Sequence, residues 1–191
     1  MDRTIYLDLA ASGAALPIGT DLVVHEAHDI ESLMHDPTRL GEAAAIAARR
    51  WRAPLAFPLM DLKLEKDQLL SQFGVPEAER DTYHFSDIPT DADIANVKNH
   101  FQANISLRMK ATCGAISWVA ANTDLVPLGM CIGPFSLATK LLADPITPIY
   151  LMGSGVSPQE DPAVAQVRQV LRLATEMVLA YTTAQLDAGA K

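Results

Sequence analysis

Two short apolar segments bounded by prolines constrain the fold of this chain most. The first runs from Pro54 to Leu64 and is apolar up to Asp61; the second covers residues 125–132 and ends at Gly133–Pro134. Continuous apolar runs of this length are too short for helices and are typical of strands buried on both faces. We predict two parallel strands, with Asp61 and Gly133 at the same edge.

Helical patterns precede, separate and follow these two segments. Asp36–Pro37 predicts the start of a helix over 37–51, and a capping-box pattern at Thr90 predicts a single long helix over 91–121. Further helices are expected over 65–73, 135–143 and 158–187, with an extended lead-in over 4–35. No alternating pattern or hairpin turn indicates antiparallel pairing, so the order of elements predicts the α/β class.

Charge and cysteine usage exclude several classes of partner. Asp and Glu total 23 against 15 Lys and Arg, giving a net charge of −8, so we expect no nucleic-acid partner. No uninterrupted apolar run reaches membrane-spanning length and no secretion signal is seen, so we expect a cytoplasmic protein with no membrane contact. Cys113 and Cys131 form no CxxC motif and are expected to be small core residues in a reducing compartment.

The expected strand ends supply the candidate site residues. A carboxylate at the carboxyl end of a parallel strand, such as Asp61, lies where barrel enzymes build their sites, and capping of the next turn is the alternative. Glu65 lies one turn later on the same rim. Gly133 and Pro134 would turn the chain there, and Phe135 would wall a pocket or simply begin a helix.

Two other patterns have ordinary structural interpretations. The histidines at 25, 28 and 35, interleaved with Glu26 and Asp29, have spacings that suit a metal, but they lie in a polar stretch where histidines often bind nothing. Met152-Gly153-Ser154-Gly155 lacks both a preceding strand and dinucleotide-binding spacing. We therefore assign no residue as a metal ligand, His84 and His100 included.

Three stretches of the chain resemble the uroporphyrinogen decarboxylase superfamily. The first is Pro54-Leu55-Ala56-Phe57-Pro58-Leu59-Met60-Asp61-Leu62. The second, Pro127-Leu128-Gly129-Met130-Cys131-Ile132-Gly133-Pro134-Phe135-Ser136-Leu137-Ala138, is similar to the strand of that family ending in Gly-Pro-Phe-Thr-Leu-Ala. The third is the closing helix that leads into Leu186-Asp187-Ala188-Gly189-Ala190.

This resemblance implies a fold and a set of site residues. Residues 54–191 would form the N-terminal part of a TIM (β/α)8-type barrel, preceded by a helical N-terminal extension over 1–53. Asp61 and Glu65 would be catalytic residues, while Gly133, Pro134, Phe135 and Lys140 would bind substrate. Because two strands leave open sheet edges, we expect an incomplete catalytic unit that forms homo-oligomers or binds a complementing chain.

Differences from the family indicate which branch the chain resembles. The arginine-rich segment with which the decarboxylases bind porphyrinogen carboxylates is absent. The nearby cluster of Arg49, Arg50 and Arg52 lies at the end of a predicted helix instead. In addition, Lys140 replaces the tyrosine of the decarboxylases. The chain is more similar to the methylcobalamin:coenzyme M methyltransferase-like branch. That branch transfers methyl groups between a corrinoid protein and an acceptor and uses zinc, whose ligands lie in a part of the barrel without a counterpart here. Uroporphyrinogen decarboxylation and non-catalytic partner binding are the alternatives.

Overall fold

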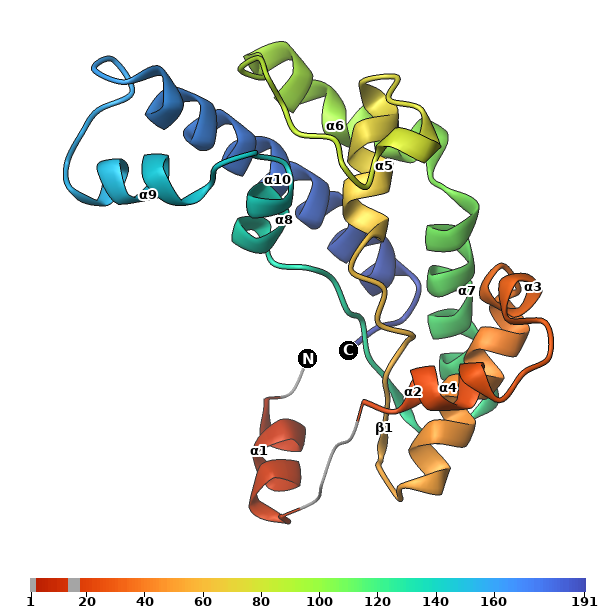
Figure 1. Cartoon of the computed structure of the whole chain (residues 1–191). Helices are drawn as coiled ribbons and strands as arrows, with labels where there is room; N and C mark the ends of the chain where they lie inside the picture. Colours follow the sequence, from red (N-terminus) through yellow and green to blue (C-terminus); the bar gives the residue numbers. More distant parts are fainter. Residues whose placement is uncertain (1–2, 14–17) are drawn as a thin grey trace. The chain divides into compact units, whose positions relative to one another are not determined.

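The computed structural model describes residues 3–13 and 18–191 and is predominantly helical, with 62% of the chain in helix. Its elements follow one another along the chain as Figure 1 shows. They are α1 (Thr4–Ala11), α2 (Thr20–His25), α3 (Ile30–Met34), α4 (Pro37–Arg50), β1 (Leu55–Ala56), α5 (Leu64–Gln72), the 3₁₀ helix η1 (Glu77–Glu79), α6 (Asp91–Asn104), α7 (Leu107–Asn122), β2 (Val126–Pro127), α8 (Pro134–Lys140), α9 (Ile146–Gly153) and α10 (Pro162–Asp187).

The prediction of a partial TIM barrel is wrong. The two apolar segments do pair in parallel, with Leu55 opposite Val126, but the described residues hold only these two short strands in a mainly helical chain. Prolines explain much of why the two strands are short, since a residue without an N–H cannot donate a hydrogen bond to a neighbouring strand. Pro127 lies within β2 itself, and two flanking bonds, Val126 N to Pro54 O and Leu128 N to Ala56 O, complete the pairing.

The N-terminal part is helical instead of an extended lead-in. Residues predicted to be extended form α1, α2 and α3, while residues 14–17 lie outside the described ranges. Val23 and Val24 of α2 are buried in a cluster with Leu40 of α4, so tertiary packing supports a helix of only six residues. The predicted helix over 37–51 is confirmed as α4, which the Asp36 side chain caps by accepting bonds from Thr38 N and Arg39 N.

The long helix expected over 91–121 is two helices. The Thr90 capping box begins α6 as predicted, but the chain leaves the helical conformation at Ile105, with ψ of 128°, before α7 begins. A buried side chain from α5 satisfies the backbone groups freed by this break. Gln68 accepts a bond from Ser106 N at 2.8 Å and donates to Asn104 O at 3.2 Å.

The last third of the chain differs from the expected pattern in two places. A helix, α9, occupies the region expected to be a break and a turn; its prolines, Pro145 and Pro148, fall at its start, where a missing N–H costs nothing. The final helix begins at Pro162, later than expected, because Asp161 Oδ1 accepts bonds from Ala163 N and Val164 N. The helix over 65–73 is confirmed as α5, which ends before Gly74 at a φ of +68°.

The chain divides into two compact units of discontinuous sequence. Unit 1 comprises residues 1–60, 107–130 and 183–191, and unit 2 comprises 61–106 and 131–182. Unit 1 is organised around α4 packed on α7, where small residues allow close approach: a Cβ on Gly41 would lie 2.7 Å from the Trp118 ring. Gln185 also belongs to unit 1, and it bonds both the N–H and the C=O of Met130.

Unit 2 has its own buried core. Its fully buried side chains come from α5, α6, α8 and the part of α10 within this unit, and include Leu69, Leu70, Val97, Leu137, Val164, Leu173 and Met177. The Phe101 and Tyr181 rings lie 6.4 Å apart in this core. The candidate site residues Asp61, Glu65, Gly133, Pro134, Phe135 and Lys140 all belong to unit 2.

Candidate functional site

The most unusual polar group of unit 2 is the carboxyl of Glu65, in the first turn of α5. The residue is 1% exposed, and its Oε1 accepts a hydrogen bond from Ile132 N at 2.9 Å. The other oxygen, Oε2, is buried and has no hydrogen-bond partner among the described residues. A buried carboxyl with spare bonding capacity is costly for folding, and such costs are often retained for function.

The surroundings of Glu65 favour its protonated form. Burial raises the pKa of the Glu65 carboxyl above its ordinary value, and the nearby Asp61 carboxylate raises it further. The Ile132 N–H, the Glu65 N–H and the charge of Lys140 act in the opposite direction. An acid whose pKa is raised toward neutrality is suited to exchange protons with a substrate.

Asp61 has the capping role that was the alternative for it, and its catalytic role stays a prediction, since β1 ends at Ala56 and Asp61 does not lie at a strand end. Its Oδ1 accepts a bond from Lys63 N at 3.1 Å, which fixes the turn leading into α5, as the capping alternative predicts. It is half-buried and close enough to Glu65 to affect the pKa of that carboxyl. The structure therefore brings the two sequence-predicted carboxylates together.

The predicted substrate-binding residues that follow Ile132 lie in different environments. Gly133 precedes α8 in ordinary extended backbone, with φ of −69°, and its C=O accepts the bond from Leu137 N that starts the helix. Pro134 is the first residue of α8, and Phe135 is 55% exposed, so most of its ring faces solvent. Lys140 ends α8, and its charge lowers the pKa of the Glu65 carboxyl.

Lys66 is a buried base that sequence analysis did not identify. It is 6% exposed, and its Nζ donates to Asp81 O at 2.9 Å, while the neighbouring Lys63 pairs with the Asp81 carboxylate at 2.7 Å. Burial lowers the pKa of the Lys66 ammonium. No pattern in the sequence distinguishes this lysine from its solvated neighbours, because the loop that covers it, around Asp81, lies 15 residues away.

The histidines expected to bind no metal have other partners. His25 Nδ1 lies 2.7 Å from Asp21 O, and His35 Nδ1 lies 2.9 Å from Glu31 O, each one turn back along its helix. Glu26 and Asp29, which alternate with these histidines in the sequence, pair with Arg50 and Arg39 respectively. Within residues 3–13 and 18–191, no three His, Cys, Asp or Glu side chains come together to hold a metal, so these residues do not fit a zinc centre.

Arg50 makes contacts within the protein, and the two cysteines form no disulfide. Arg50 forms two hydrogen bonds with Glu26 and lies 5.6 Å from the centre of the Trp51 ring, an arrangement that occupies its guanidinium. Cys113 and Cys131 are free thiols. Burial raises the pKa of the Cys113 thiol to about 11, so this thiol stays protonated and unreactive at neutral pH.

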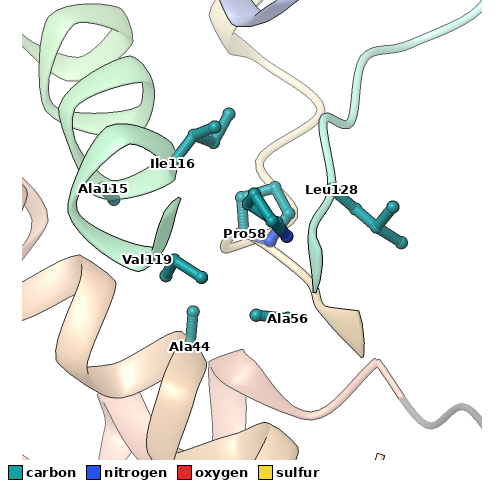
Figure 2. Close-up of a pocket in the computed structure, with 8 residues that line it drawn as sticks. Ala44, Ala56, Pro58, Ala115, Ile116, Val119 and Leu128 are labelled. Carbon is teal, nitrogen blue, oxygen red and sulfur yellow. The ribbon is translucent and has the colours of Figure 1, made fainter. Parts of the chain in front are cut away.

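A small and a larger cavity lie in unit 1. Figure 2 shows the smaller, around which Ala44, Ala56 and Val119 gather; it measures about 10 Å³, its lining is apolar, and it is too small for a ligand. The larger measures about 390 Å³. Its lining is mostly apolar and comes from Tyr6, Ala120, Leu125, Val126, Pro127, Gly189 and Lys191.

Comparison with known proteins found no matching family model, curated protein or solved structure. None of the helices in the described ranges combines the length and apolarity that crossing a membrane requires.

Proposed function

We propose that this chain takes part in methyl transfer between a corrinoid protein and an acceptor, with Glu65 as its proton-exchanging group. One observation carries the proposal. The first two stretches that resemble the superfamily pair in parallel at β1 and β2, with Leu55 opposite Val126. Ile132, in the second stretch, donates its N–H to the buried carboxyl of Glu65, which follows the first stretch closely in the sequence.

The chemistry of this acid suits the proposed reaction. When the acceptor is a thiol, the cobalt–methyl bond of the partner's corrinoid would break and leave its electron pair on the cobalt as the sulfur–methyl bond forms. The thiol proton must also leave, and the Glu65 carboxyl, with its raised pKa, is suited to receive it once ionised. Lys140 and Asp61 would set the charge around that carboxyl. Zinc chemistry forms no step of this proposal, because the described residues do not supply its ligands.

The corrinoid in this proposal belongs to the partner protein and is the methyl donor. The reaction would take place in the cytoplasm, where the free thiols of Cys113 and Cys131 remain reduced. Uroporphyrinogen decarboxylation is less well supported. In the cluster of Arg49, Arg50 and Arg52, the Arg50 guanidinium already forms an ion pair with the Glu26 carboxylate. Non-catalytic partner binding stays the alternative in which Glu65 has no chemical role.

An assay with free methylcobalamin as donor and a small thiol as acceptor tests this proposal. We expect the full chain to accelerate loss of the methylcobalamin absorbance and formation of the S-methyl product by roughly 10²-fold over thiol alone, the lower end of general acid–base catalysis. Glu65→Gln should abolish most of this acceleration. Glu79→Gln, which removes an exposed carboxylate of the same unit, should leave it unchanged.

The outcomes separate the alternatives. No acceleration with the wild-type chain would reject the methyl-transfer proposal, and acceleration that survives Glu65→Gln would reject the role of Glu65. Formation of coproporphyrinogen from uroporphyrinogen in a parallel assay would select the decarboxylase instead. Folding of each variant is checked by circular dichroism before its rate is compared.

A further inference from the structure

The larger cavity of unit 1 has the size and the lining of a small-molecule site. Its volume of about 390 Å³ falls within the range of about 300–1,000 Å³ that is usual for ligand pockets. Leu125, Val126 and Pro127 supply an apolar wall that includes β2. Ala120 of α7 and the ring of Tyr6 in α1 add to this apolar surface. Such a lining binds the apolar body of a ligand, because both surfaces leave water.

The edge of β2 at this cavity is not free to pair with another strand. Pro127 has no N–H, its C=O accepts a bond from Lys191 N at 3.0 Å, and Val126 N donates to Pro54 O at 3.0 Å. The other N–H groups of the lining also have partners: Leu125 N donates to Thr123 Oγ1, Gly189 N to Leu186 O and Tyr6 N to Arg3 O, while Ala120 lies inside α7. An extended peptide binds a sheet edge through free backbone groups, so this cavity is suited to a small molecule instead.

The charge of the lining indicates the polar group of the ligand. Of the seven lining residues, Lys191 alone has a charged side chain. None of the ion pairs among the described residues involves Lys191. An ammonium group binds a carboxylate through charge-assisted hydrogen bonds. An apolar wall with one cation and no spare backbone N–H therefore matches an apolar ligand that carries one acidic group.

We propose that this cavity binds a small apolar monocarboxylate, such as a medium-chain fatty acid, with its hydrocarbon chain against Leu125 and Val126 and its carboxylate at Lys191. Removal of the hydrocarbon chain from water supplies most of the affinity. Lys191 is exposed, so its charge strengthens binding only roughly two- to fivefold, as exposed ion pairs do. That gain is specific to the acid and is absent for an uncharged ligand of the same length.

Calorimetric titration of the full chain with octanoate and with octanol tests the proposal. We expect saturable binding of octanoate, one molecule per chain. Ala120→Phe places a ring in the cavity and should weaken the binding of both ligands by roughly tenfold or more, since it takes the space of at least two methylene groups. Lys191→Gln should weaken octanoate binding roughly two- to fivefold and leave octanol binding unchanged.

Matched controls make the same changes outside the cavity. Ala95→Phe and Lys98→Gln alter exposed positions of α6 in unit 2 and should leave the binding of both ligands unchanged. Ala120 is exposed, so Ala120→Phe should fold, which unchanged thermal unfolding would verify. Ala120→Leu, a smaller filling, should give an intermediate loss of affinity and serves as the test if Ala120→Phe unfolds.

Three results would overturn the proposal. Octanoate that shows no saturable binding would mean that the cavity takes no such ligand. Binding that the Ala120 variants leave unchanged would place the ligand elsewhere on the chain. Equal losses for octanoate and octanol in Lys191→Gln would reject the ammonium as the partner of the acid. These readouts involve neither methyl transfer nor Glu65, so they stand or fall separately from the proposed function.

Discussion

At the scale of single residues, Glu65 is a nearly fully buried carboxyl of unit 2. Its side chain combines near-complete burial, one bond from Ile132 N and one oxygen without a partner among the described residues. Lys66, the next residue, is also buried, and burial lowers the pKa of its ammonium. Successive residues of α5 are thus an acid and a base, each shifted toward its neutral form.

The raised pKa of Glu65 predicts how stability depends on pH. Below the ordinary pKa of 4.5 the carboxyl is protonated in both the folded and the unfolded chain. As pH rises above that value the unfolded state ionises first, so the folded state loses stability, by at most about 1.4 kcal/mol per pH unit for one proton. The loss ends when pH exceeds the folded pKa. Asp61 and Lys140 face this group and modulate the effect.

Glu65→Gln removes this titration and tests the prediction. Urea unfolding of wild type and variant should show similar stabilities near pH 4, below the ordinary pKa of 4.5. As pH rises above that value the variant should become more stable than wild type with the slope predicted for one proton, until pH passes the raised pKa of the folded chain. Carboxylates that do not interact with Glu65 cancel in this difference. A constant difference across this range would show that Glu65 ionises as readily in the folded chain as in the unfolded chain.

At the scale of elements, the packing of α4 on α7 depends on small residues. A Cβ on Gly41 would lie 2.7 Å from the Trp118 ring and 3.0 Å from the Trp118 Cβ, so Gly41→Ala forces the helices apart or moves the tryptophan. We expect a loss of about 1–2 kcal/mol in the free energy of unfolding, since overpacking outweighs the helix propensity gained.

A second helical glycine provides the control for this prediction. Nothing lies within 4 Å of a Cβ built on Gly153 of α9. Gly153→Ala should therefore leave stability unchanged or raise it by up to about 1 kcal/mol through helix propensity. Chemical unfolding of both variants measures the contrast, and equal effects would show that Trp118 does not restrict the site of Gly41.

At the scale of the whole molecule, the division into two units predicts local unfolding. Each unit has its own buried core, although the chain passes between the units four times. Cores of this kind often open as separate cooperative units. We expect Gly41→Ala to speed amide hydrogen exchange in α4 and α7 of unit 1 and to leave α5 and α6 of unit 2 unchanged. A uniform increase along the chain would indicate a single cooperative unit.

The sequence by itself determined the features that depend on neighbouring residues. The Asp36 cap with Pro37 begins α4, the Thr90 capping box begins α6, and Gly74 follows the end of α5, all as predicted. The pairing of the two apolar segments was also predictable, because proline-bounded apolar runs favour buried strands. Of the candidate site, the proximity of Asp61 to Glu65 follows from their spacing of one helical turn.

Only the tertiary structure decided the features that depend on distant residues. Two strands of two residues each could not be distinguished by pattern from longer barrel strands, which made the partial-barrel prediction wrong. The break between α6 and α7 is stabilised by Gln68, and the burial of Lys66 involves the loop at Asp81. The burial of Glu65 likewise depends on a distant segment, since its Oε1 bonds to Ile132 N, 67 residues away. Burial raises a pKa only when the chain folds around the group, and local sequence does not encode which segments will cover it.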